Sequence, residues 1–205
     1  TPDGEVWWWW DASDWIPDAA QEHIHGNMAL VDEDHAWFNS LFLATLYKLD
    51  RTSGELLWAL GDGGDFELLG EHETPWVEQA HAPEIQPDGS ILMYDNGTYP
   101  SRPFSRAVQY ELDEDAMTAD IVWEYPGDLA DDPWFTSYWG DADRLPNGNT
   151  LITSGSVLEF DTLSSVFEVT ADGRKAWHVM VLSRTEGGFA GGYGAERIPL
   201  PLGVL

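Results

Sequence analysis

Short runs of alternating apolar and polar residues recur along the chain, each broken by a turn signal. One run covers residues 46–50, turns at 51–54 and continues over 55–58. Period-two alternation on both sides of Asp, Gly or Thr is typical of an antiparallel hairpin. The sequence predicts three such hairpins, over residues 45–60, 107–124 and 165–178, and their second strands carry Trp58, Trp123 and Trp177 at equivalent positions.

A second unit alternates with these hairpins. Residues 81–94 match residues 140–153, which lie 59 positions later, and residues 25–38 are a looser copy 56 positions earlier. Each of the two close copies turns at Pro-Asp-Gly or Pro-Asn-Gly, where Gly or Asn supplies the positive φ that such turns require. The second unit is therefore a hairpin as well.

Two hairpins per repeat give four short antiparallel strands, which is the composition of a β-propeller blade. The pattern predicts an all-β fold, and the only weak helical candidate is residues 11–20, interrupted by Pro17. About three and a half repeats are present, with residues 6–10 as the second half of a preceding copy, whereas closed propellers typically have about 4–8 blades. We expect residues 1–205 to be a single partial propeller lacking amino-terminal blades, or part of a larger ring. An open sandwich is the alternative.

An incomplete ring leaves an unpaired edge. We therefore expect self-association, or further blades from additional polypeptide.

Charge excludes several classes of partner. The chain of 205 residues has 9 Lys and Arg against 37 Asp and Glu, which gives a formal charge of −28. Nucleic-acid binding needs clustered cations, so we expect no nucleic-acid partner.

Apolar stretches such as residues 41–46 are too short to span a bilayer, so no membrane insertion is expected. Residues 1–20 show no export signal. Without cysteine, neither disulfides nor thiolate chemistry are available.

Histidine is the best candidate for chemistry. His81 opens the second unit, just before the strand that would line a propeller channel, and His25 is aligned with it one repeat earlier. In the third copy Gly140 takes this position, followed by Asp141. Recurrence at one place favours function, although both histidines could simply bond backbone beside the channel. We expect His35, His72 and His178 to be turn, loop or surface residues.

Other candidates surround these histidines. Arg106 is one of only nine cations, so it is a natural partner for an anion, although a salt bridge is an equally good interpretation. Asn27 and Asn96 could donate amide hydrogen bonds to a substrate, while Asn96-Gly97 is also a common turn. Trp139 belongs to an aromatic loop that could stack on a phenolic ring or pack on its blade.

Acidic runs at residues 32–34, 113–115 and 128–132 are typical of solvated turns. Calcium prefers several carboxylate oxygens in one loop, but no run has the spacing of an EF-hand. We therefore assign no metal ligands and no cofactor, with calcium as the alternative.

Several motifs in order resemble the arylsulfotransferase (ASST-type) propeller family. They are His25-x-Asn27, Thr52-x-Gly54-Glu55-x-x-Trp58, His81 with Pro87-Asp88-Gly89, Asp95-Asn96-Gly97, Leu145-Pro146-Asn147-Gly148-Asn149, and the closing segment from Tyr193 to Arg197-Ile198. The resemblance covers nearly the whole chain. It implies transfer of a sulfuryl group from an aryl sulfate ester to a phenol through a histidine, in a periplasmic or extracellular protein.

On this resemblance, His81, His25 and Arg106 form the catalytic group and Asn27, Asn96 and Trp139 contact a small aromatic sulfate or phenol. A neutral imidazole is a good nucleophile, and cationic donors stabilise charge on the sulfate oxygens and the leaving phenolate. If the family's carrier histidine belongs at Gly140, it is missing here. The alternative is therefore a non-catalytic propeller that binds a ligand, a carbohydrate or a protein.

Overall fold

The computed structural model describes residues 3–6, 8–16, 24–126, 134–155, 162–182 and 191–198. Within these residues the one helical element is a 3₁₀ turn, η1 (Ala12–Asp14), whose preceding Asp11 accepts a hydrogen bond from the Ser13 amide. The weak helical candidate over 11–20 is thus a single turn in its described part. No described helix has the length and apolar character needed to cross a membrane.

Three sheets follow one another along the described chain, two of four strands and one of five, and each contains four consecutive antiparallel strands, which confirms the all-β fold of propeller blades. The first blade comprises β1 (Gly26–Val31), β2 (His35–Ser40), β3 (Thr45–Asp50) and β4 (Leu56–Leu60). The second comprises β6 (Ala80–Ile85), β7 (Ile91–Asp95), β8 (Arg106–Asp113) and β9 (Thr118–Pro126). The third comprises β10 (Gly140–Arg144), β11 (Thr150–Ser154), β12 (Thr162–Val169) and β13 (Lys175–Leu182). A short strand, β5 (Glu67–Leu68), pairs in parallel with β9.

The three predicted outer hairpins share one register. Trp58 pairs with Lys48, Trp123 with Gln109 and Trp177 with Glu168, and in every hairpin the pairing shifts immediately after this pair. A bulge at the same point in each hairpin confirms that the blades are repeats. The tryptophans differ in burial, because Trp58 and Trp123 face a following blade, whereas Trp177 on the last described blade is 42% exposed.

This difference in burial predicts different costs of truncation. Trp58→Ala removes a side chain that is only 4% exposed and packs edge-on against Phe66, so it should lower the free energy of unfolding by about 3–5 kcal/mol. Trp177→Ala should cost about 1 kcal/mol, because much of that ring is already in water. Urea unfolding of both variants measures the difference. Equal costs would contradict the blade assignment.

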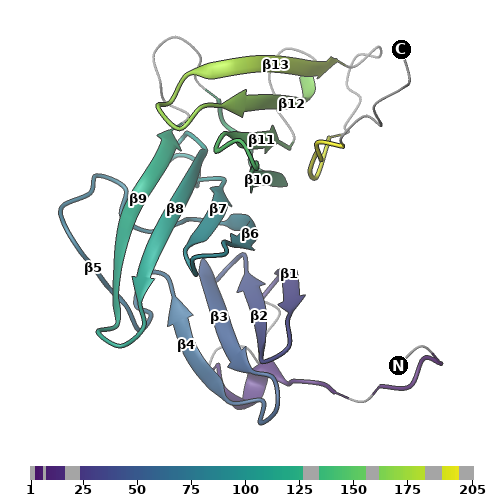
Figure 1. Cartoon of the computed structure of the whole chain (residues 1–205), viewed down its shortest axis with the longest axis vertical. Coiled ribbons are helices and arrows are strands. Elements are labelled where there is room, and N and C mark those ends of the chain that lie inside the picture. Colours follow the sequence, from purple (N-terminus) through teal and green to yellow (C-terminus); the bar gives the residue numbers. More distant parts are fainter. Residues whose placement is uncertain are drawn as a thin grey trace.

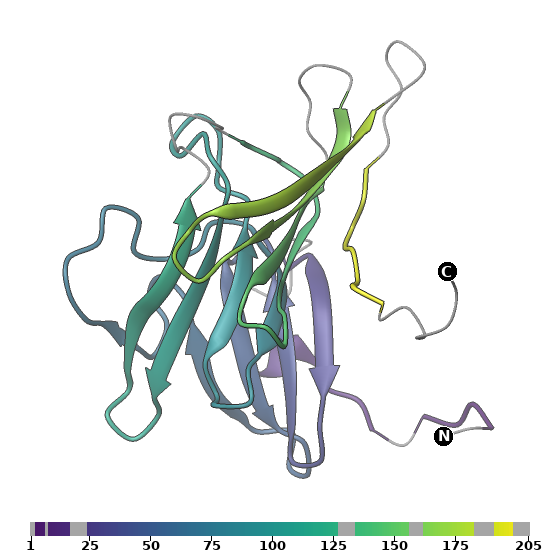
Figure 2. The same cartoon turned by 45° about the horizontal axis from the view of Figure 1, so that its top comes forward.

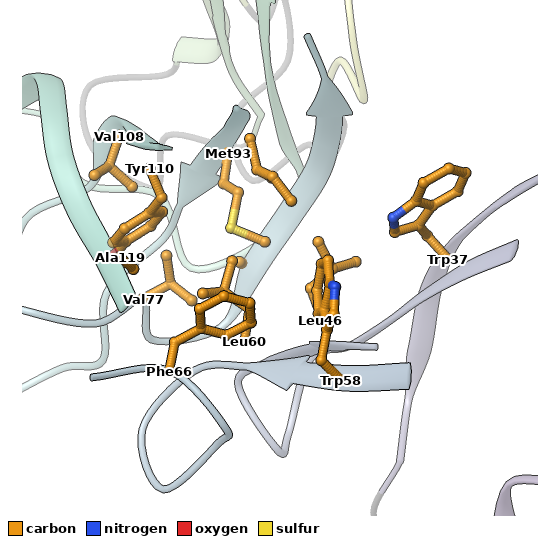
Figure 3. Close-up of a cluster of buried hydrophobic side chains, with 12 residues drawn as sticks. Trp37, Leu46, Trp58, Leu60, Phe66, Val77, Met93, Val108, Tyr110 and Ala119 are labelled. Carbon is orange, nitrogen blue, oxygen red and sulfur yellow. The ribbon is translucent and has the colours of Figure 1, made fainter. Parts of the chain in front are cut away.

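Apolar clusters join neighbouring blades. The first lies between blades one and two, where Trp58 and Leu60 of β4 point toward Met93 of β7 and Tyr110 of β8 (Figure 3). The second lies between blades two and three and includes Tyr94, Tyr125 and Phe167. The inner strand β6 also contacts β1 and β10. These contacts place the inner strands of all three blades around one centre.

The blades form an open arc, and the described residues 191–198 lie on its open side (Figure 1). The described part of residues 6–10 forms no strand; Trp9 is 73% exposed and Trp10 packs on Phe38 with ring centroids 5.9 Å apart. Residues 191–198, yellow in Figure 2, run between the third blade and the first. Self-association and additional blades stay predictions.

Candidate functional site

His81 lies on the innermost strand of the middle blade, opposite Tyr94 of β7. Its side chain is buried, with an exposed fraction of 4%. The Nδ1 atom lies 2.7 Å from Oδ1 of Asn96, the residue that follows β7. His81 and Asn96 were both predicted as site residues, and the structure brings them into direct contact.

Asn96 fixes the tautomer of His81. The Asn96 amide nitrogen donates to the backbone carbonyls of Thr136 and Trp139, each at 2.8 Å, so its oxygen is the atom that faces the imidazole. An oxygen can only accept, and Nδ1 of His81 must therefore carry the proton. In the neutral ring the lone pair is then on Nε2. Asn96 is a positioning residue for His81, in place of the direct substrate contact that was predicted.

Burial also keeps His81 uncharged. Desolvation lowers the pKa of the imidazole, and the neighbouring charge of His25 adds to this, while hydrogen bonds to Asn96 and to the Gln79 backbone partly oppose it. A buried ring that holds its proton on Nδ1 and is neutral near pH 7 has the electronic form of a nucleophile.

The strand register corrects the alignment of the histidines. Gly26, Ala80 and Gly140 are equivalent, because they pair with Ser40, Asp95 and Ser154 at the ends of the second strands. His81 is therefore equivalent to Asp141, and both occupy the second position of their strands, as Asn27 does in β1.

His25 is consequently not equivalent to His81. It shares its position with Gln79 and Trp139, and all three have a positive φ (38°, 58° and 58°) just before the inner strand. A left-handed residue there turns the chain into each blade. A bulge after His81 adds one residue to β6 and accounts for the one-position error between Gly140 and Asp141, whereas His25 was misaligned by two positions, since it corresponds to Gln79. His25 is exposed and packs on Phe42, with ring centroids 5.0 Å apart.

Asn27 joins the first blade to the second. Its Nδ2 donates to the carbonyl of Ala80 at 2.8 Å, and its Oδ1 accepts from Asn39 at 2.6 Å. Both polar ends of the amide are thus engaged by protein. Asn27 holds the residue next to His81 in place, and the predicted substrate contact finds no support in this geometry.

Arg106 does not lie at the His81 site, contrary to the prediction. Its side chain is fully buried, and Nε donates to Asp95 at 3.0 Å, while the two terminal nitrogens bond Glu124 and the backbone carbonyls of Thr74 and Trp76. Arg102 also donates to Asp95. The guanidinium of Arg106 is occupied within the second blade, which supports the salt-bridge interpretation.

Sequence reasoning placed Trp139 beside the substrate and overlooked Tyr193. The ring of Trp139 lies beneath Gly191, where a Cβ would come 2.8 Å from its Cζ3 atom. Tyr193 packs edge-on against His81, with ring centroids 5.8 Å apart, and its hydroxyl donates to the Asn27 carbonyl at 3.1 Å. Tyr193 belongs to the closing motif, but no periodicity connects it to His81.

Carboxyl groups border the site on the third blade. Burial, followed by the charges of Asp143, Glu84 and Glu196, raises the pKa of Asp141 to about 7. Burial and the charges of Glu84 and Glu196 raise that of Asp143 to about 6. Across the described residues, no group of three or more His, Asp or Glu side chains is arranged to hold a metal ion.

A family model described as arylsulfotransferase (ASST) matches residues 18–186. No curated protein matches the chain. Among solved structures, the chain is similar to a protein of unknown function from Bacteroides caccae, with 13% sequence identity and a TM-score of 0.44. That similarity covers 78% of this chain and 47% of the other, so the chain spans about half the length of that protein.

Proposed function

Because this chain belongs to the arylsulfotransferase family, we propose that it transfers a sulfuryl group from an aryl sulfate to a phenol with His81 as the carrier. The observation that supports this role is the fixed, neutral imidazole: Asn96 holds Nδ1 and burial disfavours the charged form. We also propose that the protein is exported to the periplasm or to the outside of the cell.

The transfer takes two steps. Nε2 of His81 attacks the sulfur of the donor, the N–S bond forms, the S–O bond to the aryl group breaks, and the phenolate leaves with the electron pair. The oxygen of an acceptor phenol then attacks the same sulfur, the N–S bond breaks, and the phenolic proton passes to solvent or to the departed phenolate. Splitting the reaction in this way replaces one difficult displacement by two easier ones.

In this proposal His25 binds the sulfate oxygens. Arg106 is sequestered by Asp95 and Glu124, whereas His25 is exposed and lies close enough for its charge to act on His81. Charge stabilisation by one imidazole is weaker than that by a bidentate guanidinium.

A second candidate function is ligand binding without transfer. Two observations favour it: Arg106 is occupied within the blade, and Asp141 stands at the position equivalent to His81. In this alternative the chain binds a carbohydrate or a protein, or calcium through its carboxylates. A p-nitrophenyl sulfate assay with a phenol acceptor at pH 8 separates the two functions, because release of nitrophenolate that depends on the acceptor occurs only with a transferase.

The state of His81 can be measured directly. We expect the imidazole to titrate below its ordinary pKa of about 6.5, because burial penalises the charged ring. It should be neutral, with the proton on Nδ1, from about pH 7 upward, and lose this form as the pH falls through the lowered pKa. Nitrogen-15 NMR of labelled histidine, assigned by His81→Gln, reports both the pKa and the tautomer. A proton on Nε2 at neutral pH would contradict the assigned role.

A further inference from the structure

Residues 191–198 lie across the inner strands of the third blade. At Gly191 a Cβ would come 2.5 Å from the Gly155 carbonyl oxygen, and at Gly194 it would collide with the Asp141 carboxyl group. The chain lies this close because these positions have no side chain. The Gly192 amide donates to the Gly155 carbonyl at 3.1 Å, and Arg197 pairs with Glu168 at 3.3 Å.

The same segment covers His81. Tyr193 extends from it to the middle of the arc, where its ring meets His81 at 72° and its hydroxyl reaches the first blade at Asn27. His81 is therefore 4% exposed in this arrangement. An aryl ring that approaches the imidazole needs the space that Tyr193 fills.

The carboxyl group of Asp141 lies against Gly194 of this segment, and the charges of three more carboxyl groups act on it. Asp141 and Asp143 come from β10, Glu84 from β6 and Glu196 from the covering segment itself. The phenol of Tyr193 also feels the charge of Asp141. Two cations are nearby: the Arg144 guanidinium bonds Gln109 and Thr150 and also feels the charge of Glu84, and Arg197 pairs with Glu168.

We propose that residues 191–198 form a strap that closes over His81 while the carboxyl groups beneath it are protonated and lifts when they ionise. In the closed state Tyr193 occupies the place of an aryl substrate ring. The proposal rests on the proposed function only for the identity of the incoming ring.

The sign of the pH effect follows from the raised pKa values. Protonated carboxyl groups tolerate burial under the strap, whereas ionised ones repel one another and lose hydration. The stabilisation of the closed strap by protonated carboxyl groups is fully present below the pKa of the uncovered carboxyl groups, about 3.9 for Asp. It is lost as the pH rises through the covered values of about 6 for Asp143 and about 7 for Asp141.

Amide hydrogen exchange of residues 191–198, followed by mass spectrometry, tests the strap without any substrate. After correction for intrinsic exchange rates, protection should be about tenfold or more lower at pH 8 than at pH 5.5, since each pKa unit is a factor of ten. Asp141→Asn cannot ionise and should retain protection at pH 8. Asp120→Asn, on the exposed face of β9, is the matched control and should behave as the wild type. Equal protection at both pH values, or an Asp141→Asn variant that loosens like the wild type, would overturn the proposal.

A second variant tests closure over His81. Gly191→Ala places a methyl group against the Gly155 backbone carbonyl and should unseat the strap at pH 6, which increases the rate at which diethyl pyrocarbonate modifies His81. Unchanged modification would also overturn the proposal. Neither measurement uses a sulfate donor. If the strap responds to pH but the protein turns over no aryl sulfate, the proposed function is wrong and the strap proposal stands.

Discussion

His81→Ala is expected to abolish sulfuryl transfer, with a loss of at least about 10³-fold in kcat at pH 8, since removing a covalent nucleophile leaves only binding and charge stabilisation. No labelled protein should be recovered from a ³⁵S-labelled aryl sulfate. Nitrophenolate release that depends on a phenol acceptor measures the rate. Circular dichroism should show the wild-type fold, because the lost ring contacts Asn96 and Tyr193 and belongs to neither apolar cluster.

The companion variant Asn96→Ala separates positioning from chemistry. The imidazole remains, but the Asn96 oxygen no longer holds its Nδ1 proton, so a loss of about 100-fold is expected from misplacement of the reacting atom. A His81→Ala variant that retains the full rate would exclude His81 as the carrier and make His25 the next candidate. A wild-type protein that turns over no aryl sulfate would favour the binding function.

Arg106→Met should lower the free energy of unfolding by about 3 kcal/mol, because the fully buried Asp95 loses one of its two arginine partners and keeps Arg102. Urea unfolding monitored by tryptophan fluorescence measures the change. Arg174→Met is the control: its ion pair with Asp172 is largely exposed and should contribute far less. Adding Asp95→Leu to Arg106→Met should recover only part of the loss, because the buried Arg102 then loses its Asp95 partner and keeps Glu78 at 3.8 Å.

The same variant tests the corrected role of Arg106. Because its guanidinium bonds Asp95, Glu124 and the 74–76 backbone, the folded fraction of Arg106→Met should keep the wild-type kcat. A drop of 100-fold or more in a variant that is stably folded would place Arg106 on the sulfate after all.

The blades could be predicted from sequence because their signals are local. Alternation, turn residues and a recurring tryptophan specify each hairpin without reference to the rest of the molecule. Spacing alone could not provide the equivalence of His81 and Asp141, because a bulge after His81 inserts one residue and shifts the comparison. Bulges leave almost no trace in a single sequence.

The site was predicted in part. His81 was selected through an alignment with His25 that the strand register corrects, and Asn96 was selected as an amide donor near it; the structure brings the two into contact. Arg106 was misplaced, because the scarcity of cations says nothing about which carboxylate a cation meets; the buried Asp95 takes it. Tyr193 lies 112 positions after His81, and only the folding of the chain across the third blade connects the two.

The burial of Arg102 and Arg106 affects how the proposed aryl sulfate donor reaches the protein. Both arginines form ion pairs with Asp95 inside the second blade, while the chain carries a formal charge of −28. An aryl sulfate is an anion, so it approaches this protein against a repulsive long-range field. Dissolved salt shortens the reach of that field to about 8 Å at physiological ionic strength. Association with an anionic donor should therefore become faster as the medium becomes more saline, the reverse of ordinary electrostatic steering.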